Sequence, residues 1–212
     1  MGLYSRHIFP HIVNLSLGGA KLARLRHQTL KEVEGKVLEI GFGTGLNLRH
    51  YPRRVREIDT IDPNPGMQKN SQKRIAKSDI KVHQHLLAGD TLPFAAETFD
   101  SVVSTWTLCS IDRVEQALRE IYRVLKPKGR FYFLEHGLSP DPKVQVWQRR
   151  LTPLQKILAD GCHLNRAVDD ILDAERFKIL QLKKFYYPRY PKIFGFFYQG
   201  IAEKQPLVSL VY

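Results

Sequence analysis

The sequence predicts an α/β protein whose doubly wound, mostly parallel sheet has seven strands and ends in a C-terminal antiparallel hairpin. From Gly35 onward, short apolar runs alternate with helical patterns, as is typical of βαβ units. A glycine-rich turn follows the first of these runs, and no helix separates the last two strand-like runs. The chain has 212 residues, which suits one domain.

Five apolar runs predict the parallel strands. They cover residues 36–40, 57–61, 81–87, 100–105 and 130–134. Helices are expected over residues 46–50, 66–77 and 114–125. The last of these helices places Val114, Leu118 and Ile121 at helical spacing. Pro127 and Gly129 are expected to end it.

The remaining segments depart from this alternation. Residues 177–186 and 193–202 are strand-like and adjacent, so we expect an antiparallel hairpin at the sheet edge. A helical insert over residues 142–174 precedes this hairpin. Near the N-terminus, the apolar stretch 8–20 is too short to cross a bilayer, which requires about 20 apolar residues. It also lacks the features of a secretory signal.

Charge and cysteine content narrow the function classes. The 33 Lys and Arg residues against 21 Asp and Glu give a net charge of +12. This excess would attract nucleic acid, a lipid surface or an acidic metabolite, or would serve solubility alone. Cys109 and Cys162 show no CxxC or Cys/His spacing, so no metal site is expected. Two thiols in a chain of this size also suggest a reduced, cytoplasmic protein.

The strongest motif is the glycine-rich turn after the first strand, where Glu39 precedes glycines at positions 41, 43 and 45. Glycines at such a turn let the backbone approach a ligand closely. A dinucleotide fingerprint would need glycine at position 46, where Leu46 stands. The carboxylate of Glu39 would repel a pyrophosphate and favour a ligand with a positive charge.

A second motif ends the next strand, where Asp62 is followed by Pro63. A carboxylate at this place in an α/β nucleoside site accepts hydrogen bonds from both ribose hydroxyls. An Asp-Pro pair is otherwise a common turn. Its place after the glycine-rich strand favours the ribose role.

These motifs resemble those of class I S-adenosylmethionine-dependent methyltransferases, whose pattern is E/D-x-G-x-G-x-G. The loop 88–94 with Asp90, the segment 97–100 and the segment 126–130 follow in the order of that family. The resemblance covers residues 36–136, and it implies a Rossmann-like fold with S-adenosylmethionine as cofactor and S-adenosylhomocysteine as product. In the family, the acidic residue at the position of Asp90 accepts a hydrogen bond from the adenine amino group.

The residues that the glycine-rich pattern and this resemblance together suggest for cofactor binding follow the first four strands. They are Glu39, Gly41, Gly43, Gly45, Asn47, Asp62, Pro63, Asn64, Met67, Gly89, Asp90, Thr91, Leu92 and Thr105.

Smaller motifs resemble the alkyl-thiol methyltransferases of the methyltransferase-like seven group. They are Phe9-Pro10, Leu108-Cys109-Ser110, the segment 133–136, and the segment 160–162 with Arg166. The resemblance implies S-methylation of a small apolar thiol. The chain also resembles the wider ubiquinone and phospholipid methyltransferases, so a quinone-like or phospholipid acceptor is the alternative. Those thiol methyltransferases carry a membrane-anchor helix ahead of the first motif, and we expect this chain to lack it.

RNA methylation is the less favoured alternative. Amino-directed nucleic-acid methyltransferases carry Asn/Asp-Pro-Pro-aromatic after the fourth strand, whereas residues 104–107 here are Ser-Thr-Trp-Thr. A nucleic-acid partner is therefore not expected, and a small-molecule substrate is.

A thiol acceptor places modest demands on the protein. A thiol with a pKa of ~8.5 is already a few per cent ionised at neutral pH and is a strong nucleophile. If a catalytic base exists, we expect His136 at the end of the fifth strand, although a packed histidine is an equal alternative. Candidate substrate-pocket residues, each of which could instead pack in the core, are Tyr4, Phe9, Trp106, Cys109, Trp147 and His163.

The C-terminal third suggests a second surface. Residues 143–212 are basic, and they include the aromatic residues Phe194, Phe196, Phe197 and Tyr198. Such a segment could rest peripherally on an anionic membrane, or it could be an ordinary solvated face.

We expect the chain, residues 1–212, to form one methyltransferase domain in four parts. These are an N-terminal helical cover (1–34), a cofactor-binding core (35–136), a helical insert (137–175) and an edge hairpin (176–205). The oligomeric state is left open.

Overall fold

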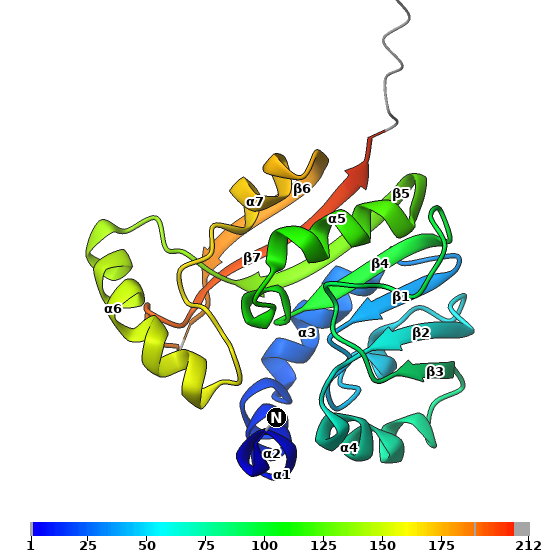
Figure 1. The fold of residues 1–212 in the computed structure, drawn as a ribbon, viewed down its shortest axis with the longest axis horizontal. Coiled ribbons are helices and arrows are strands. Elements are labelled where there is room, and N and C mark those ends of the chain that lie inside the picture. Colours follow the sequence, from blue (N-terminus) through cyan, green and yellow to red (C-terminus); the bar gives the residue numbers. More distant parts are fainter. Residues whose placement is uncertain (1, 189, 206–212) are drawn as a thin grey trace, which may run out of the picture.

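Seven strands form one sheet in the order β3-β2-β1-β4-β5-β7-β6, which confirms the predicted fold class (Figure 1). The computed structural model describes residues 2–188 and 190–205, so residues 1, 189 and 206–212 of the expected domain lie outside the described residues. β1 to β5 pair in parallel, and β7 pairs antiparallel with β5 and β6. The strands are β1 (Val37–Ile40), β2 (Glu57–Ile61), β3 (Lys81–His85), β4 (Phe99–Thr105), β5 (Leu125–His136), β6 (Phe177–Tyr186) and β7 (Phe196–Lys204).

The strand order reverses at β1, which pairs with β2 on one side and β4 on the other. All four residues of β1 are buried, as expected for a central parallel strand covered on both faces. In open α/β sheets a crevice forms at such a reversal, outside the carboxyl ends of the strands. The fold therefore places a ligand site at the end of β1.

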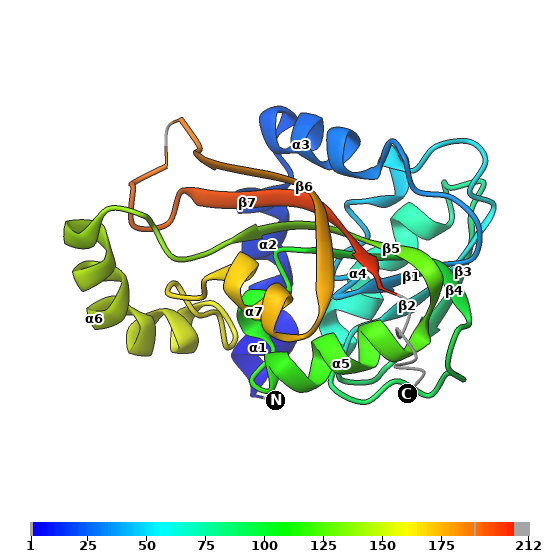
Figure 2. The same ribbon diagram turned by 90° about the horizontal axis from the view of Figure 1, so that it is seen from above.

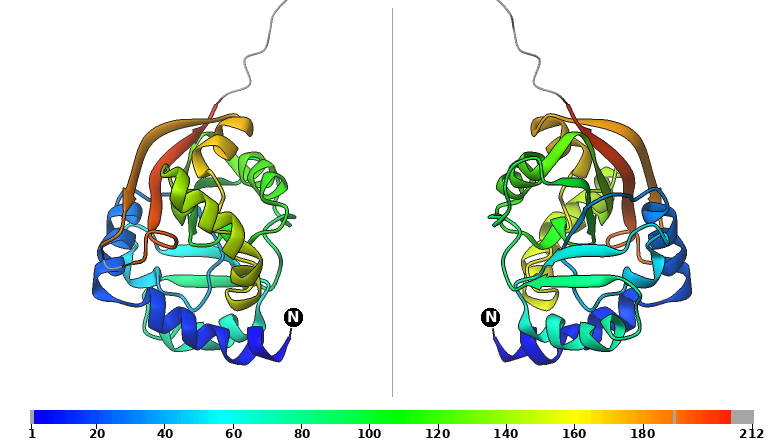
Figure 3. Two further views of the ribbon diagram at one scale, coloured as in Figure 1. Left: turned by 90° about the vertical axis from the view of Figure 1, so that its left-hand side faces the viewer. Right: turned by 90° about the vertical axis from the view of Figure 1, so that its right-hand side faces the viewer.

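Helices cover both faces of this sheet (Figure 2). α3 lies on one face, and α5 and α7 lie on the other. α1 and α2 contact α4 beside the sheet (Figure 3). The helices are α1 (Leu3–His7), α2 (Phe9–Leu17), α3 (Ala20–Leu30), α4 (Pro65–Ile75), α5 (Val114–Val124), α6 (Pro142–Leu158) and α7 (Val168–Ala174), with short 3₁₀ helices η1 (Leu48–His50) and η2 (Leu108–Ser110).

The core consists of two apolar layers, one on each face of the sheet. Neighbouring residues of a strand point to opposite faces, so Leu38 packs in the layer below α5 while Val37 packs in the layer below α3. α5 buries Leu118 and Ile121 in the first layer, as its apolar spacing predicts. Three of the four aromatic residues that the sequence suggested for a membrane surface are buried within or against the sheet: Phe196, Phe197 and Tyr198. That part of the membrane expectation is wrong, because β7 is an interior strand.

Several predicted boundaries differ from the structure for local reasons. The expected helix 46–50 is only the 3₁₀ turn η1, since Leu48 N donates to Gly45 O. The helical insert divides into α6 and α7. β7 begins later than predicted because Phe194 N donates to Pro191 O in a turn.

Among the described residues, no helix is both long and apolar enough to cross a bilayer.

Candidate functional site

A cavity of about 960 Å³ opens at the carboxyl ends of the central strands, where the fold predicts a ligand site. This volume lies within the range of small-molecule sites. Phe9 and Ile12 of α2 and Leu158 at the end of α6 contribute to its walls. The cavity therefore lies between the cofactor motifs of the sheet and two helices outside it.

The glycine-rich turn requires glycine at its first position. Gly41 has a φ of 72°, a left-handed conformation, and a Cβ there would lie 2.0 Å from Thr107 Oγ1. Gly43 also has a positive φ, and its N–H donates to Asp62 Oδ2 at 2.7 Å. Gly41 and Gly43 line the cavity, whereas Gly45 shapes the turn behind it. The turn thus links the first two cofactor motifs directly.

Glu39 is buried beneath this turn and is fully hydrogen-bonded. Its carboxylate accepts from Asn47 Nδ2 at 2.8 Å and from the Tyr51 hydroxyl at 2.6 Å. Burial raises the pKa of Glu39 to about 7, against these two hydrogen bonds. Asn47 also donates to Thr105 Oγ1 at 3.0 Å, while its own Oδ1 is buried without a partner among the described residues. Tyr51 is a site residue that the sequence analysis missed.

Asp62 stands at the cavity wall with both oxygens oriented by the backbone. Oδ2 accepts from Gly43 N, and Oδ1 accepts from Asn64 N at 2.9 Å. Burial raises the pKa of Asp62 to about 6. Pro63 and Met67 line the same wall.

Asn64 also lines the cavity, but its side chain is already used by the fold. Its Oδ1 caps α4 by accepting from Gly66 N, and its Nδ2 donates to Ser5 O at 2.8 Å. This bond ties α1 to the start of α4. The side-chain contacts of Asn64 therefore indicate a positioning residue.

The loop after β3 places some of its residues at the cavity wall and others in the core. Gly89 and Asp90 line the cavity, and Asp90 pairs with Arg113 at 2.6 Å. Thr91 and Leu92 lie outside the lining, contrary to expectation, because Leu92 packs into the core and its N–H donates to Glu120.

Arg26 of α3 is a second residue that the sequence analysis missed. It is only 4% exposed, lines the cavity, and stacks 4.4 Å above the Trp106 ring. Its Nε and Nη1 are buried without hydrogen-bond partners in the described part of the chain. Burial lowers the pKa of Arg26 to about 10, so it remains charged at neutral pH. Nothing in the sequence pattern distinguishes Arg26 from the other basic residues of this helix.

Half of the predicted substrate residues line the cavity: Phe9, Trp106 and Cys109. Three others do not. Trp147 lies on α6 with 52% of its surface exposed. The Tyr4 hydroxyl donates to Leu158 O at 2.7 Å, and His163 N donates to Cys109 O at 2.8 Å. Tyr4 and His163 thus brace the segments that form the cavity.

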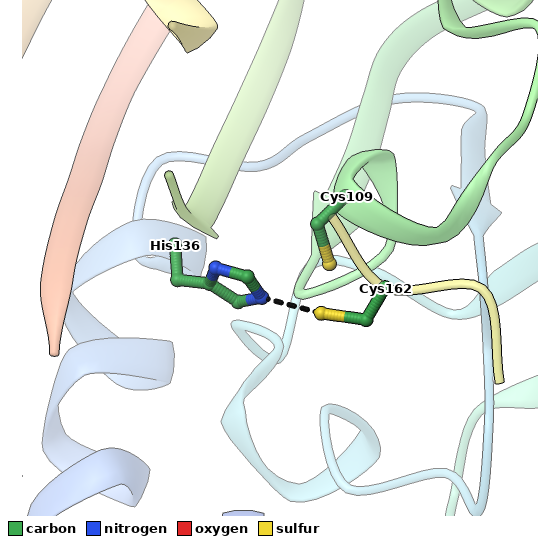
Figure 4. A group of neighbouring side chains, drawn as sticks. All are labelled: Cys109, His136 and Cys162. Carbon is green, nitrogen blue, oxygen red and sulfur yellow. Dashed lines mark hydrogen bonds between the residues drawn. The ribbon is translucent and has the colours of Figure 1, made fainter. Parts of the chain in front are cut away.

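At the wall of the cavity, three side chains from distant segments meet (Figure 4). Cys109, His136 and Cys162 place their sulfur and nitrogen atoms within 4.8 Å of one another. His136 Nε2 lies 2.8 Å from Cys162 Sγ. The hydrogen bond from Cys162 lowers the pKa of Cys109 well below its ordinary value. Burial opposes ionisation of His136, but the negative charge of Cys109 raises its pKa.

Comparisons with known proteins indicate a methyltransferase domain. Residues 38–133 match a methyltransferase domain family. The chain is 37% identical to human thiol S-methyltransferase TMT1A over 156 residues, which cover 72% of this chain and 64% of that protein. It is 33% identical to the ubiquinone/menaquinone biosynthesis C-methyltransferase UbiE of Cereibacter sphaeroides over 114 residues, covering 52% and 46%. The chain spans 63–66% of the length of four mammalian thiol S-methyltransferases.

Solved structures share the fold at lower identity. The YcgJ protein of Bacillus subtilis superposes with a TM-score of 0.67 and 18% identity, covering 87% of this chain and 98% of that one. A geranyl diphosphate methyltransferase in complex with S-adenosylmethionine superposes with a TM-score of 0.66 and 14% identity, covering 87% and 84%. The matched domain and the relatives show that this chain carries an S-adenosylmethionine-dependent methyltransferase domain, and the solved structures show that its seven-stranded sheet has the fold of such domains.

Proposed function

We propose that this protein transfers a methyl group from S-adenosylmethionine to the sulfur of a small apolar thiol. One observation carries the proposal: a single cavity joins the glycine-rich turn and Asp62 to an apolar wall that ends at Cys109 and His136. Both reactants can therefore meet in one space. The similarity to thiol S-methyltransferases supports the choice of acceptor.

At one end of the cavity, the residues around the glycine-rich turn and Asp62 fit S-adenosylmethionine, which supplies a methyl group activated by a sulfonium. Asp62 would accept hydrogen bonds from the ribose hydroxyls, and Asp90 would accept one from the adenine amino group. Arg26, with unpaired guanidinium donors in the described structure, would bind the carboxylate of the amino-acid part. Glu39 would hold the turn through Asn47 and would favour the positive charge nearby.

At the other end, alignment and exclusion of water would supply most of the rate. Phe9 and Trp106 give apolar walls, and Trp106 is held by an edge contact with Phe197 at 5.7 Å. A thiolate is less well stabilised in such surroundings than in water, which increases its reactivity. His136 lines the cavity at this end, in the cluster with Cys109 and Cys162.

The test is a screen for S-adenosylhomocysteine release with an alkanethiol, phospholipid vesicles, a quinol and RNA as acceptors. We expect turnover of the alkanethiol and production of its methyl thioether. The same assay compares Asp62→Asn with Glu57→Gln. Glu57→Gln is the matched carboxylate control, because Glu57 is the first residue of β2 and does not line the cavity. Turnover of phospholipid or quinol with none on any thiol would refute the thiol assignment.

The lipid alternative has its own observation. Exposed apolar residues lie on α2 and α6, the two helices that wall the cavity, and at the residue that precedes α2: Ile8, Ile12, Leu15, Leu154 and Ile157. Hydrogen bonds from Tyr4 and Ser5 of α1 to Leu158 and Asp160 tie the helix before α2 to the end of α6. We propose that this surface rests on a membrane, from which an apolar acceptor would enter the cavity.

Cosedimentation with anionic vesicles tests the membrane contact. Leu15→Glu should reduce binding at least about tenfold, because burying a leucine contributes about 1.5–3 kcal/mol. Leu180→Glu, on the exposed edge strand β6, is the control and should bind as the unaltered protein does. Equal loss in both variants would argue against a defined membrane-facing surface.

A further inference from the structure

We propose that Cys109, His136 and Cys162 bind a zinc ion whose fourth coordination position opens into the cavity and receives the acceptor thiol. The existence of the site is argued from geometry alone, while its role in activating the acceptor rests on the proposed thiol methylation.

The three side chains supply the right ligand atoms at nearly the right separation. Tetrahedral zinc, with Zn–S bonds of about 2.3 Å and Zn–N bonds of about 2.0–2.1 Å, sets its ligand atoms about 3.5–3.8 Å apart. The sulfur and nitrogen atoms here lie within 4.8 Å of one another, and the shortest separation is the 2.8 Å from His136 Nε2 to Cys162 Sγ. Side-chain movements of about 1 Å would bring all three into coordination.

The number of ligands and their position indicate a reactive site. Structural zinc sites have four protein ligands, whereas catalytic sites have three and leave one position for water or substrate. Cys109 is 3% exposed and Cys162 is 5% exposed, yet all three side chains line the cavity. The open position would therefore face the space that holds the acceptor.

Surrounding contacts hold the two cysteine-bearing segments in place. Arg166 donates to the carbonyls of Leu108 and Ile111 on either side of Cys109. His163 N donates to the carbonyl of Cys109 itself. Such outer contacts orient metal ligands and keep their geometry when the metal exchanges a ligand.

Gln155 of α6 contacts the other sulfur, since its Nε2 lies 3.8 Å from Cys162 Sγ. The two thiolates would neutralise the charge of Zn²⁺. A third thiolate, from the acceptor, would then make the complex negative and keep its sulfur electron-rich.

At such a site the acceptor R–SH displaces water from the zinc, and its proton passes to solvent. An electron pair of the bound thiolate forms the new S–CH₃ bond while the bond from the methyl carbon to the sulfonium breaks. That second electron pair stays on the donor sulfur, which gives S-adenosylhomocysteine. The neutral thioether R–S–CH₃ is a weak zinc ligand and dissociates.

Coordination changes the ionisation of the acceptor by a calculable factor. A free thiol of pKa ~8.5 is about 3% ionised at pH 7, whereas a metal-bound thiol is fully deprotonated. The reactive fraction would rise about thirtyfold at pH 7. At pH ~9.5, where the free thiol is about 90% ionised, the gain would nearly vanish.

Cobalt titration tests the site itself, because tetrahedral Co²⁺ reports thiolate ligands through a sulfur-to-metal charge-transfer band. The full chain, reduced with a phosphine that offers no thiol, should bind one Co²⁺ that Zn²⁺ displaces. The charge-transfer band should weaken or disappear in each of three variants, Cys109→Ser, Cys162→Ser and His136→Gln. It should persist in His83→Gln, which alters a histidine on the edge strand β3. S-adenosylhomocysteine binding by calorimetry checks that each variant is folded. Absence of the band, the same band in all variants, or a Cys109–Cys162 disulfide that resists the reductant would overturn the site.

A second experiment tests the role in catalysis. Adding an alkanethiol should intensify the charge-transfer band as a third thiolate binds. Removing the metal with a chelator should lower methylation of a thiol of pKa ~8.5 about thirtyfold at pH 7 and little at pH ~9.5, and Zn²⁺ should restore it. Full activity of the metal-free protein at pH 7 would overturn this role while leaving thiol methylation intact. Metal binding without methylation of any thiol would instead refute the proposed function.

Discussion

Replacing Asp62 by asparagine should weaken cofactor binding and, at the same time, stabilise the unliganded protein. The carboxylate at the cavity wall is held in place by two backbone donors, Gly43 N to its Oδ2 and Asn64 N to its Oδ1. Asparagine keeps the shape and one acceptor oxygen but loses the charge. Losing charged hydrogen bonds to the ribose should cost about 2–4 kcal/mol of cofactor affinity, or about 30- to 1000-fold.

The effect on stability follows from the pKa of Asp62. Burial raises this pKa from 3.8 to about 6, so the folded protein holds the proton at pH values where the unfolded chain has released it. The free energy of unfolding therefore falls as pH rises from about 4 to about 6, and the loss persists above that range. A shift of this size corresponds to about 3 kcal/mol, and the loss of one of the two backbone hydrogen bonds would offset part of it. We therefore expect the free energy of unfolding of Asp62→Asn at pH 7 to exceed that of the unaltered protein by about 1–3 kcal/mol.

Urea unfolding at pH 4.5 and pH 7, with calorimetric binding of S-adenosylhomocysteine, measures both effects on one variant. Glu57→Gln, which alters an exposed carboxylate, should change neither quantity by more than about 0.5 kcal/mol. A folded Asp62→Asn protein with unaltered affinity would move the ribose site elsewhere. If Asp62→Asn were less stable than the unaltered protein by the same amount at pH 7 and pH 4.5, the buried charge of Asp62 would carry no energetic penalty.

Two further predictions concern the same end of the cavity. Affinity for S-adenosylhomocysteine should fall about tenfold per pH unit below pH 6, as Asp62 takes up a proton, and calorimetry should find no such slope in Asp62→Asn. Arg26→Met should weaken S-adenosylhomocysteine binding about 10- to 100-fold, by loss of a charged hydrogen bond, but should leave binding of 5′-methylthioadenosine, which lacks the carboxylate, unchanged. Equal loss for both ligands would mean that Arg26 acts through the packing of Trp106.

The sequence predicted those features that depend on neighbours along the chain. The glycine-rich turn could be recognised because a left-handed φ and the close approach of Thr107 leave Gly41 no alternative. The amphipathic spacing of α5 likewise follows from the chain alone. Boundaries were less predictable, since the start of β7 depends on a turn that only its hydrogen bonds reveal.

Residues that act through distant contacts could not be assigned in the same way. Trp147 and Trp106 are equally aromatic in the sequence, but only Trp106 follows a strand that ends at the cavity, while Trp147 lies on the outer side of α6. Arg26 is recognised as a site residue because it stacks on the Trp106 ring and because two of its buried nitrogens have no hydrogen-bond partner in the described structure. Both facts depend on how α3 packs on one face of the sheet.

The cysteine–histidine cluster shows the same limit most clearly. Metal motifs are recognised from ligands a few residues apart, which one turn or helix brings together. Here the ligands come from η2, the end of β5 and the loop after α6, and they meet only because β4 and β5 are parallel neighbours that end at one edge. α6 then returns the chain to that edge, where the Ser5–Asp160 hydrogen bond holds the loop against α1. The same topology that creates the cofactor crevice therefore also gathers the two thiols and the imidazole at its far end, where an acceptor sulfur would have to lie.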